Sequence, residues 1–201
     1  MPEHYYTQTP LSAHKAASLQ FTYRSHSLIF ETDSGVFSRL EIDKGSALLL
    51  ASLPDSIAGD VLDAGCGYGV IGIAVGKAYP CTVTLLDINE RAVRLAAANC
   101  RLNGVMAFAL QSDGFSDLPE NRLFDWILQN PPVRAGKAVM YRMFTDAAKR
   151  LRKTGEFWLV IRKQQGAPSA LARLQTLFGS VEIVAKGRGY WVLRCYQPNE
   201  A

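Results

Sequence analysis

The sequence predicts an α/β fold with a seven-stranded, mostly parallel sheet, helices on both faces, and an antiparallel C-terminal hairpin. Two observations support this prediction. From residue 60 onward, short apolar runs alternate with segments of helical character, as in sheets built from parallel strands joined by helices. The last two apolar runs flank Lys186-Gly187-Arg188-Gly189, which is a hairpin signal.

The elements are expected in a regular order. Residues 19–31 alternate loosely and predict a β-hairpin that turns near residues 24–26, and Asp43 is a candidate N-cap for a helix over 46–53. We expect the seven sheet strands at 60–62, 82–86, 108–111, 124–128, 157–161, 181–185 and 190–196. We expect further helices over 69–79, 89–102, 137–151 and 168–178. Residues 1–45 are expected to form an N-terminal hairpin and extension, and residues 46–201 one compact domain, which carries the motifs described below.

Composition narrows the class of protein. The chain has 201 residues, of which 48% are hydrophobic and 20% charged, as in ordinary globular domains. Neither a signal-peptide core in MPEHYYTQTP nor a bilayer-spanning stretch is found, so we expect a cytoplasmic protein without a membrane partner. The four cysteines form no CxxC pair and the three histidines lie near the N-terminus, so we expect reduced thiols and no metal.

Charge is distributed unevenly along the chain. Residues 1–133 carry 9 Lys/Arg against 14 Asp/Glu, a net charge of −5, whereas residues 134–201 carry 13 against 4, a net charge of +9. A positive surface favours a phosphate-rich partner such as nucleic acid. The alternative is a solvated charged surface without a partner.

Acidic residues and glycines follow successive strands. Asp63-Ala64-Gly65-Cys66-Gly67-Tyr68-Gly69 comes directly after the first strand, and Val70 stands where a dinucleotide fingerprint would need a third glycine. This G-x-G-x-G loop resembles that of class I S-adenosylmethionine (SAM) methyltransferases. The resemblance implies the cofactor SAM, with its cationic end near Asp63, its ribose on Asp87 and its adenine amine on Asp113. The expected cofactor-binding residues are Asp63, Ala64, Gly65, Gly67, Gly69, Asp87, Ile88, Asp113 and Gly114.

The fourth strand ends in Asn130-Pro131-Pro132, where a substrate would meet the cofactor. This motif resembles the signature of methyltransferases that act on planar amino nitrogens, so Asn130, Pro131 and Pro132 are the candidate catalytic residues. The Asn130 side-chain oxygen and the Pro131 carbonyl could accept the two N–H groups of such a nitrogen, and the prolines fix the backbone that holds them. No strong base is needed, because the nitrogen loses its proton readily once it is methylated.

Substrate-binding residues are expected around this motif. The position after the prolines is often aromatic in the family but is Val133 here, so Phe37 is a candidate for the missing aromatic surface, with a core position as its alternative. Four basic residues should lie near one edge of the site and contact phosphates: Arg134, Lys137, Arg162 and Lys163.

Five segments together resemble the bacterial small-methyltransferase-domain family: TDSGVFSRLEIDKGSALLL, VLDAGCGYGVIGI, DINERAV, NPPVRAGK and IRKQQGAPSA. They most resemble short relatives of 16S rRNA guanine-N2 methyltransferases. The resemblance implies a Rossmann-like fold and methyl transfer from SAM to N2 of a guanine, with ribosomal RNA or a ribosomal subunit as partner. Larger relatives carry an additional degenerate domain, which a homodimer could replace, so a monomer or a homodimer is expected.

Two other functions are compatible with these motifs. The first is a protein glutamine N5-methyltransferase, which would use the same Asn-Pro-Pro chemistry on a side-chain amide. The second is a non-catalytic SAM-fold module that only binds RNA. Salt-sensitive RNA binding would favour the nucleic-acid substrate over the first, and measurable SAM binding would argue against the second.

Overall fold

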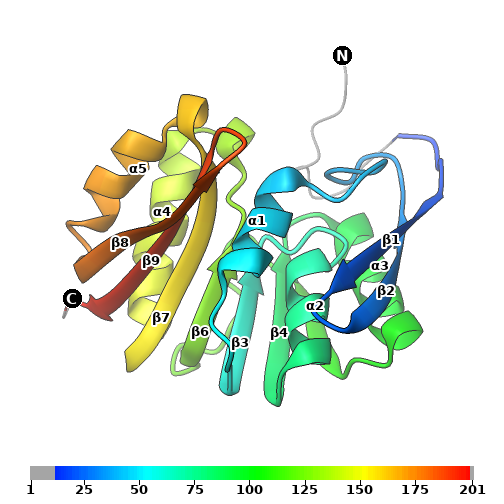
Figure 1. Ribbon diagram of the computed structural model, residues 1–201, viewed down its shortest axis with the longest axis horizontal. Coiled ribbons are helices and arrows are strands. Elements are labelled where there is room, and N and C mark those ends of the chain that lie inside the picture. Colours follow the sequence, from blue (N-terminus) through cyan, green and yellow to red (C-terminus); the bar gives the residue numbers. More distant parts are fainter. Residues whose placement is uncertain (1–11, 200–201) are drawn as a thin grey trace.

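A computed structural model describes residues 12–199 of the chain (Figure 1). The N-terminal segment MPEHYYTQTP and its His4 lie outside the described residues. The main sheet has seven strands in the order β5-β4-β3-β6-β7-β9-β8. Their bounds are β3 (Gly59–Ala64), β4 (Cys81–Asp87), β5 (Ala107–Gln111), β6 (Phe124–Gln129), β7 (Leu151–Arg162), β8 (Phe178–Gly187) and β9 (Tyr190–Pro198). The strands β3 to β7 are parallel, whereas β9 is antiparallel to both of its neighbours, which confirms the predicted fold class.

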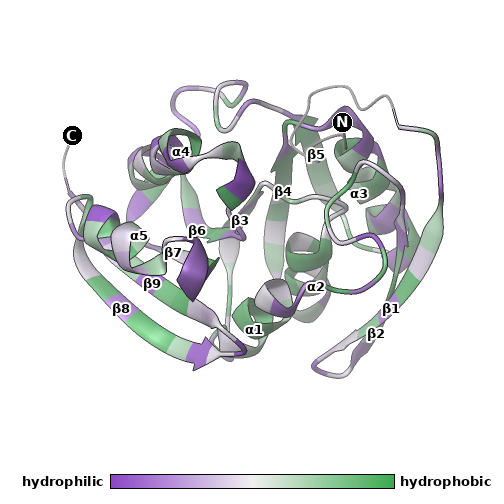
Figure 2. Ribbon diagram, turned by 90° about the horizontal axis from the view of Figure 1, so that it is seen from above, coloured by the Kyte–Doolittle hydropathy of each residue, from purple (hydrophilic) through white to green (hydrophobic). Residues whose placement is uncertain are grey.

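Helices cover both faces of the sheet (Figure 2). One apolar cluster joins the sheet to α1 (Lys44–Ser52), α2 (Val70–Ala78) and α3 (Glu90–Asn103). A second cluster joins the opposite face to α4 (Lys137–Arg150) and α5 (Ala167–Leu174). Within residues 12–199, no helix has the length and apolar character needed to cross a membrane.

Two elements differ from the sequence prediction by four or more residues at one end, and the others differ by three or fewer. Strand β7 begins at Leu151, six residues before the predicted start, because its first residues do not alternate and expose Arg152, Lys153 and Thr154. Helix α5 ends at Leu174 and not at Phe178, because three turn residues follow it and Phe178 already belongs to β8. Both differences lie far from the carboxyl ends of the central strands.

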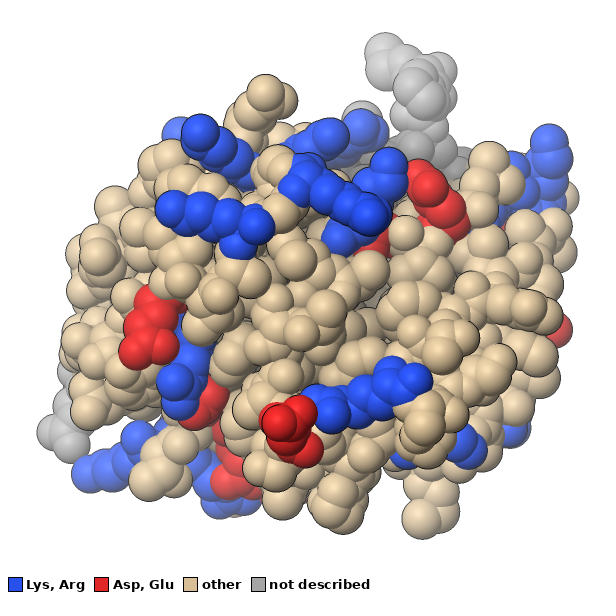
Figure 3. Space-filling view, viewed as in Figure 1, with Lys and Arg blue, Asp and Glu red and all other residues tan. Residues whose placement is uncertain are grey.

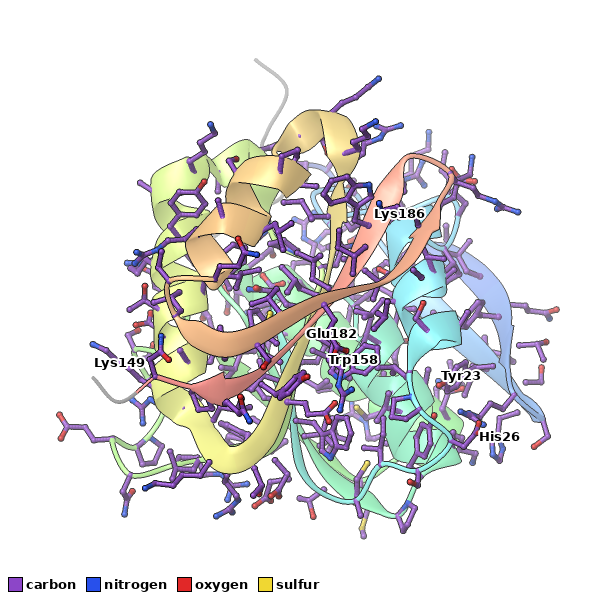
Figure 4. All side chains as sticks on the ribbon, turned by 60° about the vertical axis from the view of Figure 1, so that its left-hand side comes forward. Tyr23, His26, Lys149, Trp158, Glu182 and Lys186 are labelled. Carbon is purple, nitrogen blue, oxygen red and sulfur yellow. The ribbon has the colours of Figure 1, made fainter. Side chains whose placement is uncertain are left out.

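The N-terminal hairpin of β1 (Ala17–Tyr23) and β2 (His26–Thr32) packs beside α3. Asn99 of α3 exchanges two hydrogen bonds with the backbone of Glu31, of 2.8 and 2.9 Å. Asn103 likewise exchanges two with the backbone of Ile29, of 3.0 and 2.8 Å. These side-chain amides take the place of a neighbouring strand along the edge of β2. Figure 4 shows His26 near the lower end of the molecule and Lys186, beside the β8–β9 turn, near the upper end.

Candidate active site

A cavity of about 1000 Å³ opens at the carboxyl ends of the parallel strands. Ligands of open α/β sheets bind at this end, where the strand order reverses. Its lining comes from residues 35–38, the start of α1, the glycine loop after β3, the ends of β4 and β5, the Asn-Pro-Pro segment, α4, residues 160–165 and the start of β9. The strand order reverses between β3 and β6, so the cavity lies where the topology predicts a ligand site.

Glycines in the glycine loop adopt backbone conformations that other residues rarely adopt, and they leave the adjoining part of the cavity free of side chains. Gly65 and Gly67 have φ angles of 77° and 57°, in the left-handed region that favours glycine. A Cβ atom built on either residue would meet no atom within 4 Å. The loop is fastened to the neighbouring strand, because the backbone N–H groups of Gly65 and Cys66 both donate to the Leu86 carbonyl at 2.8 Å.

Asp63 lies beneath this loop and outside the cavity lining. Its side chain is fully buried, and its Oδ2 accepts a hydrogen bond of 2.8 Å from the Gly72 N–H in the first turn of α2. Its other oxygen, Oδ1, has no hydrogen-bond partner within the described residues. Burial, with a smaller contribution from the charge of Asp87, raises the pKa of Asp63 to about 7. Ala64 and Gly69, also predicted to bind the cofactor, are likewise outside the cavity lining.

Asp87 does line the cavity, at the carboxyl end of β4. Its Oδ2 accepts from the Gly67 N–H at 2.8 Å and its Oδ1 from the Asn89 N–H at 2.9 Å. These bonds orient the carboxylate between the glycine loop and the start of α3. Burial raises the pKa of Asp87 to about 6, and the backbone hydrogen bonds limit that rise.

The next strand contributes Ser112, Asp113 and Gly114 to the same wall, and Ile88, next to Asp87, also lines the cavity. Asp113 forms an ion pair with Arg142 of α4, and both side chains are about half exposed. The sequence prediction did not include Arg142, because a basic residue within a helix gives no signal of an acidic partner 29 positions away.

The Asn-Pro-Pro segment follows β6 and turns sharply. Pro132 has φ −75° and ψ 74°, and the Val133 N–H donates to the Pro131 carbonyl at 2.8 Å. This is an inverse γ-turn, for which the fixed φ of proline is well suited. The Pro131 carbonyl keeps a second lone pair for another donor. The two prolines thus close a tight turn at the edge of the cavity, which explains why the strand stops before Asn130.

Asn130 lines the cavity and is partly buried. Its side-chain nitrogen, Nδ2, donates to Asp43 Oδ2 at 2.9 Å and to Ser46 Oγ at 3.0 Å. Neither residue was predicted to belong to the site, and Asp43 was expected only as a helix cap. The two positions lie 87 and 84 residues before Asn130, so no local sequence pattern connects them.

The predicted substrate-binding residues divide into two groups. Phe37, Val133, Arg134 and Arg162 line the cavity, whereas the exposed Lys137 and Lys163 lie outside its lining. Tyr190, at the start of β9, also lines the cavity and is an aromatic residue that the sequence prediction missed. The guanidinium of Arg162 lies 5.6 Å from the centre of the Tyr190 ring.

Exposed basic side chains lie on the segments next to the cavity, and two of them, Arg134 and Arg162, line it. Figure 3 shows many Lys and Arg side chains along the upper edge of the molecule. The Lys163 N–H donates to the Gly189 carbonyl at 2.8 Å, which joins the β8–β9 turn to the residues after β7. We call the following residues the basic rim: Arg134, Lys137, Arg162, Lys163, Lys186 and Arg188. Within residues 12–199, Arg134, Lys137, Lys163 and Arg188 form no salt bridge.

The cavity's donors and acceptors fit SAM. Asp87 and Asp113 are carboxylates at two successive strand ends, suited to hydroxyl and amine donors, and the glycine loop leaves open space where side chains would otherwise stand. The negative charge of the acids and the absence of a basic group in residues 63–76 suit a cation and not a pyrophosphate. Within residues 12–199, no three His, Cys, Asp or Glu side chains are grouped to hold a metal ion.

The chain has relatives among known proteins. Residues 27–194 match the model of the methyltransferase small domain. The chain is 42% identical to the uncharacterized protein YbxB of Bacillus subtilis over 96% of this chain and 98% of that protein. It is 32% identical to ribosomal RNA small subunit methyltransferase C of Colwellia psychrerythraea, over 87% of this chain and 49% of that protein. The chain thus spans about half the length of the curated methyltransferase C relatives it matches.

Solved structures show the same similarity. The 16S rRNA N2 G1207 methyltransferase of T. thermophilus, solved with AdoMet and guanosine, superposes with a TM-score of 0.82 at 29% identity, over 94% of this chain and 52% of that chain. A ribosomal protein L11 methylase from Lactobacillus delbrueckii superposes with a TM-score of 0.63 at 18% identity, over 80% of this chain and 84% of that chain, which shows a shared fold alone.

Proposed function

The chain belongs to the methyltransferase small domain family, and from that premise we propose that this SAM-dependent methyltransferase acts on N2 of a guanine in 16S ribosomal RNA. The observation that carries the proposal is the position of Asn130. It follows the strand next to the glycine loop's own strand, in the same cavity as Asp87 and Asp113. An amino nitrogen held there would face the cofactor. The guanosine and the N2 specificity of the T. thermophilus relative support the choice of guanine.

In this proposal the chain's own residues orient the substrate amine. None of them acts as a base or a nucleophile. SAM, when bound, supplies a methyl group on a positively charged sulfur. The Asn130 oxygen and the free lone pair of the Pro131 carbonyl accept the two N–H groups of the exocyclic amine, which turns the nitrogen lone pair toward the methyl group. The nitrogen becomes acidic as it gains the methyl group, so its proton can leave to water. The catalytic advantage then comes from placement and electrostatics.

The basic rim would hold the RNA backbone around the target base. Its six side chains are exposed, and two of them, Arg134 and Arg162, line the cavity. Phosphate contacts of this kind fix the position of the RNA on the protein but do not read its sequence. A base paired within a duplex would have to leave the stack to reach Asn130. Phe37 and Tyr190 both line the cavity and offer aromatic surfaces for such a base. A ribosomal RNA substrate would also place the enzyme in the cytoplasm.

Methyl transfer from labelled SAM tests the reaction, with undermodified 16S RNA and 30S subunits as substrates and 23S RNA and 50S subunits as comparisons. We expect labelled N2-methylguanosine among the digested nucleosides, identified by mass spectrometry. Asn130→Ala should reduce turnover by about 10²- to 10³-fold, since it removes an acceptor that acts in the transition state. SAM binding, measured by calorimetry, should be unchanged.

Three outcomes would contradict the proposal. Near-normal turnover of Asn130→Ala would remove that residue from its role. Label on no RNA, with SAM bound, would redirect the search to a protein glutamine or a small amine. Absence of SAM binding would leave only a non-catalytic RNA-binding module.

A further inference from the structure

The Asn130 side chain is held by two hydrogen-bond acceptors that lie outside the Asn-Pro-Pro motif. Both come from the start of α1. Asp43 Oδ2 and Ser46 Oγ receive the two protons of its Nδ2, over distances of 2.9 and 3.0 Å. An ionised carboxylate offers only acceptors, so the amide group must turn its nitrogen toward Asp43. Its oxygen is therefore directed away from α1, and Asn130 itself lines the cavity.

We propose that Asp43 and Ser46 are positioning residues for methyl transfer, which lock the Asn130 amide with its oxygen available to the substrate amine. This inference rests on the proposed function, because it assumes that the Asn130 oxygen accepts a substrate N–H. The terminal torsion of asparagine is broad and roughly two-fold, so the amide does not select this orientation by itself. In the reversed orientation an NH₂ group would face the substrate's own N–H groups, and no hydrogen bond could form.

The pair is itself rigidly placed. Asp43 is the N-cap of α1, and the same Oδ2 accepts from the Ser46 N–H at 2.9 Å. Ser46 is only 6% exposed. Gly45 lies between them in the sequence, and its missing side chain leaves room for Asp43 and Tyr190. A Cβ at position 45 would come within 2.8 Å of Asp43 Oδ2 and 2.9 Å of the Tyr190 ring. The first turn of α1 is therefore closely packed against Tyr190 at the edge of the cavity.

The helix cap and the amide lock can be separated by substitution. Asp43→Ser keeps a good N-cap, but its hydroxyl is one bond shorter than the carboxylate and is drawn back to the Ser46 N–H. Asp43→Ala loses both the cap and the lock. Ser46→Ala loses one acceptor and keeps a residue of high helix propensity. Ser52→Ala, at the other end of the same helix and outside the cavity lining, is the matched control.

We expect Asp43→Ser and Asp43→Ala to lower kcat by similar factors, on the order of 10- to 100-fold, because misplacement of a reacting group has effects of this size. Ser46→Ala should lower kcat less, and Ser52→Ala should match the wild type. The SAM Kd and the KM for RNA should change little in all four. Only Asp43→Ala should lower the melting temperature appreciably. Normal kcat in Asp43→Ser, or a kcat that follows the melting temperature, would overturn the proposal.

An exchange of the two groups provides a rescue. Asn130→Asp alone places a carboxylate against the Asp43 carboxylate and should lose turnover. Adding Asp43→Asn supplies an amide that can donate to the new carboxylate, whose other oxygen again faces the cavity. The double variant should therefore recover part of the lost kcat. No recovery would contradict the lock.

A readout without substrate separates this inference from the proposed function. In the wild-type protein, the side-chain amide protons of Asn130, assigned by their loss in Asn130→Ala, should exchange slowly with solvent. They should exchange faster in Asp43→Ser and in Ser46→Ala. Slow exchange together with full activity of Asn130→Ala would reject the proposed function but not the lock. Unchanged exchange in Asp43→Ser would reject the lock alone.

Discussion

Asp87 shows at the residue scale how a single side chain can organise the end of a sheet. It receives backbone hydrogen bonds from Gly67 on one side and Asn89 on the other, and it still lines the cavity. A carboxylate has about four acceptor sites, so some remain for a ligand's hydroxyl groups. Burial of this charged group explains why its pKa is raised.

The raised pKa predicts how SAM binding depends on pH. We expect the ribose of SAM at Asp87, where its two hydroxyls can both donate only to an ionised carboxylate, because protonation turns one carboxyl oxygen into a donor. Asp87 ionises as the pH rises through about 6. SAM affinity should therefore increase from about pH 5 to about pH 7 and then level off, and at about pH 5 it should be roughly tenfold weaker than at about pH 8. Calorimetric titration at several pH values checks this.

Asp87→Asn is the control for the assignment. It should bind SAM more weakly and with little dependence on pH over the same range, because an amide does not titrate. If the variant keeps the pH dependence of the wild type, another group is responsible, and the buried Asp63, whose pKa is about 7, is the next residue to test.

At the scale of elements, the glycine loop depends on how closely α2 approaches the sheet. Gly72 lies in the first turn of α2, and a Cβ there would stand 2.2 Å from Leu85 Cδ2 and 3.1 Å from Asp63 Cβ. The close approach allows the Gly72 N–H to reach Asp63. The helix and the two strands beneath it thus hold the loop between them.

Gly72→Ala should destabilise the protein by about 1–3 kcal/mol, as other overpacked core positions do, although alanine is the better helix former. Urea unfolding with and without SAM measures the effect. Gly187→Ala is a suitable control, because its Cβ would meet Leu48 only at 3.5 Å, an ordinary contact. Equal stability of Gly72→Ala and the wild type would show that α2 can shift outward at no cost.

At the scale of the whole molecule, the basic rim and the cavity share one end of the fold. The net charge of +9 in residues 134–201 comes from segments that follow β6, and these segments include the whole basic rim. This end of the molecule should attract a polyanion, because the electrostatic potentials of the exposed basic side chains add together. Lys149, near the lower end of α4 in Figure 4, is far from Lys186 and serves as a basic residue outside the rim.

RNA binding should weaken steeply with salt, because each phosphate contact releases counterions. Arg188→Ala should reduce the slope of log K against log salt by about one, and Lys163→Ala should act similarly. Lys149→Ala should leave the slope unchanged. Filter binding or fluorescence anisotropy over a range of salt concentrations measures these slopes. If Lys149→Ala reduced the slope by the same amount, RNA binding would depend on the overall positive charge and not on the basic rim.

The order of the elements, the family and the strand-end acids could all be predicted from the sequence, because they depend on local periodicity and on short motifs. Alternating strands and helices bring Asp87, Asp113 and Asn130 to one edge by topology alone. The folded structure was needed to show that Asp63 lies beneath the loop, that Arg142 pairs with Asp113, and that Asp43 and Ser46 bind Asn130. Those contacts join positions far apart along the chain, and their geometry follows from how closely the helices pack onto the sheet, which no local pattern records.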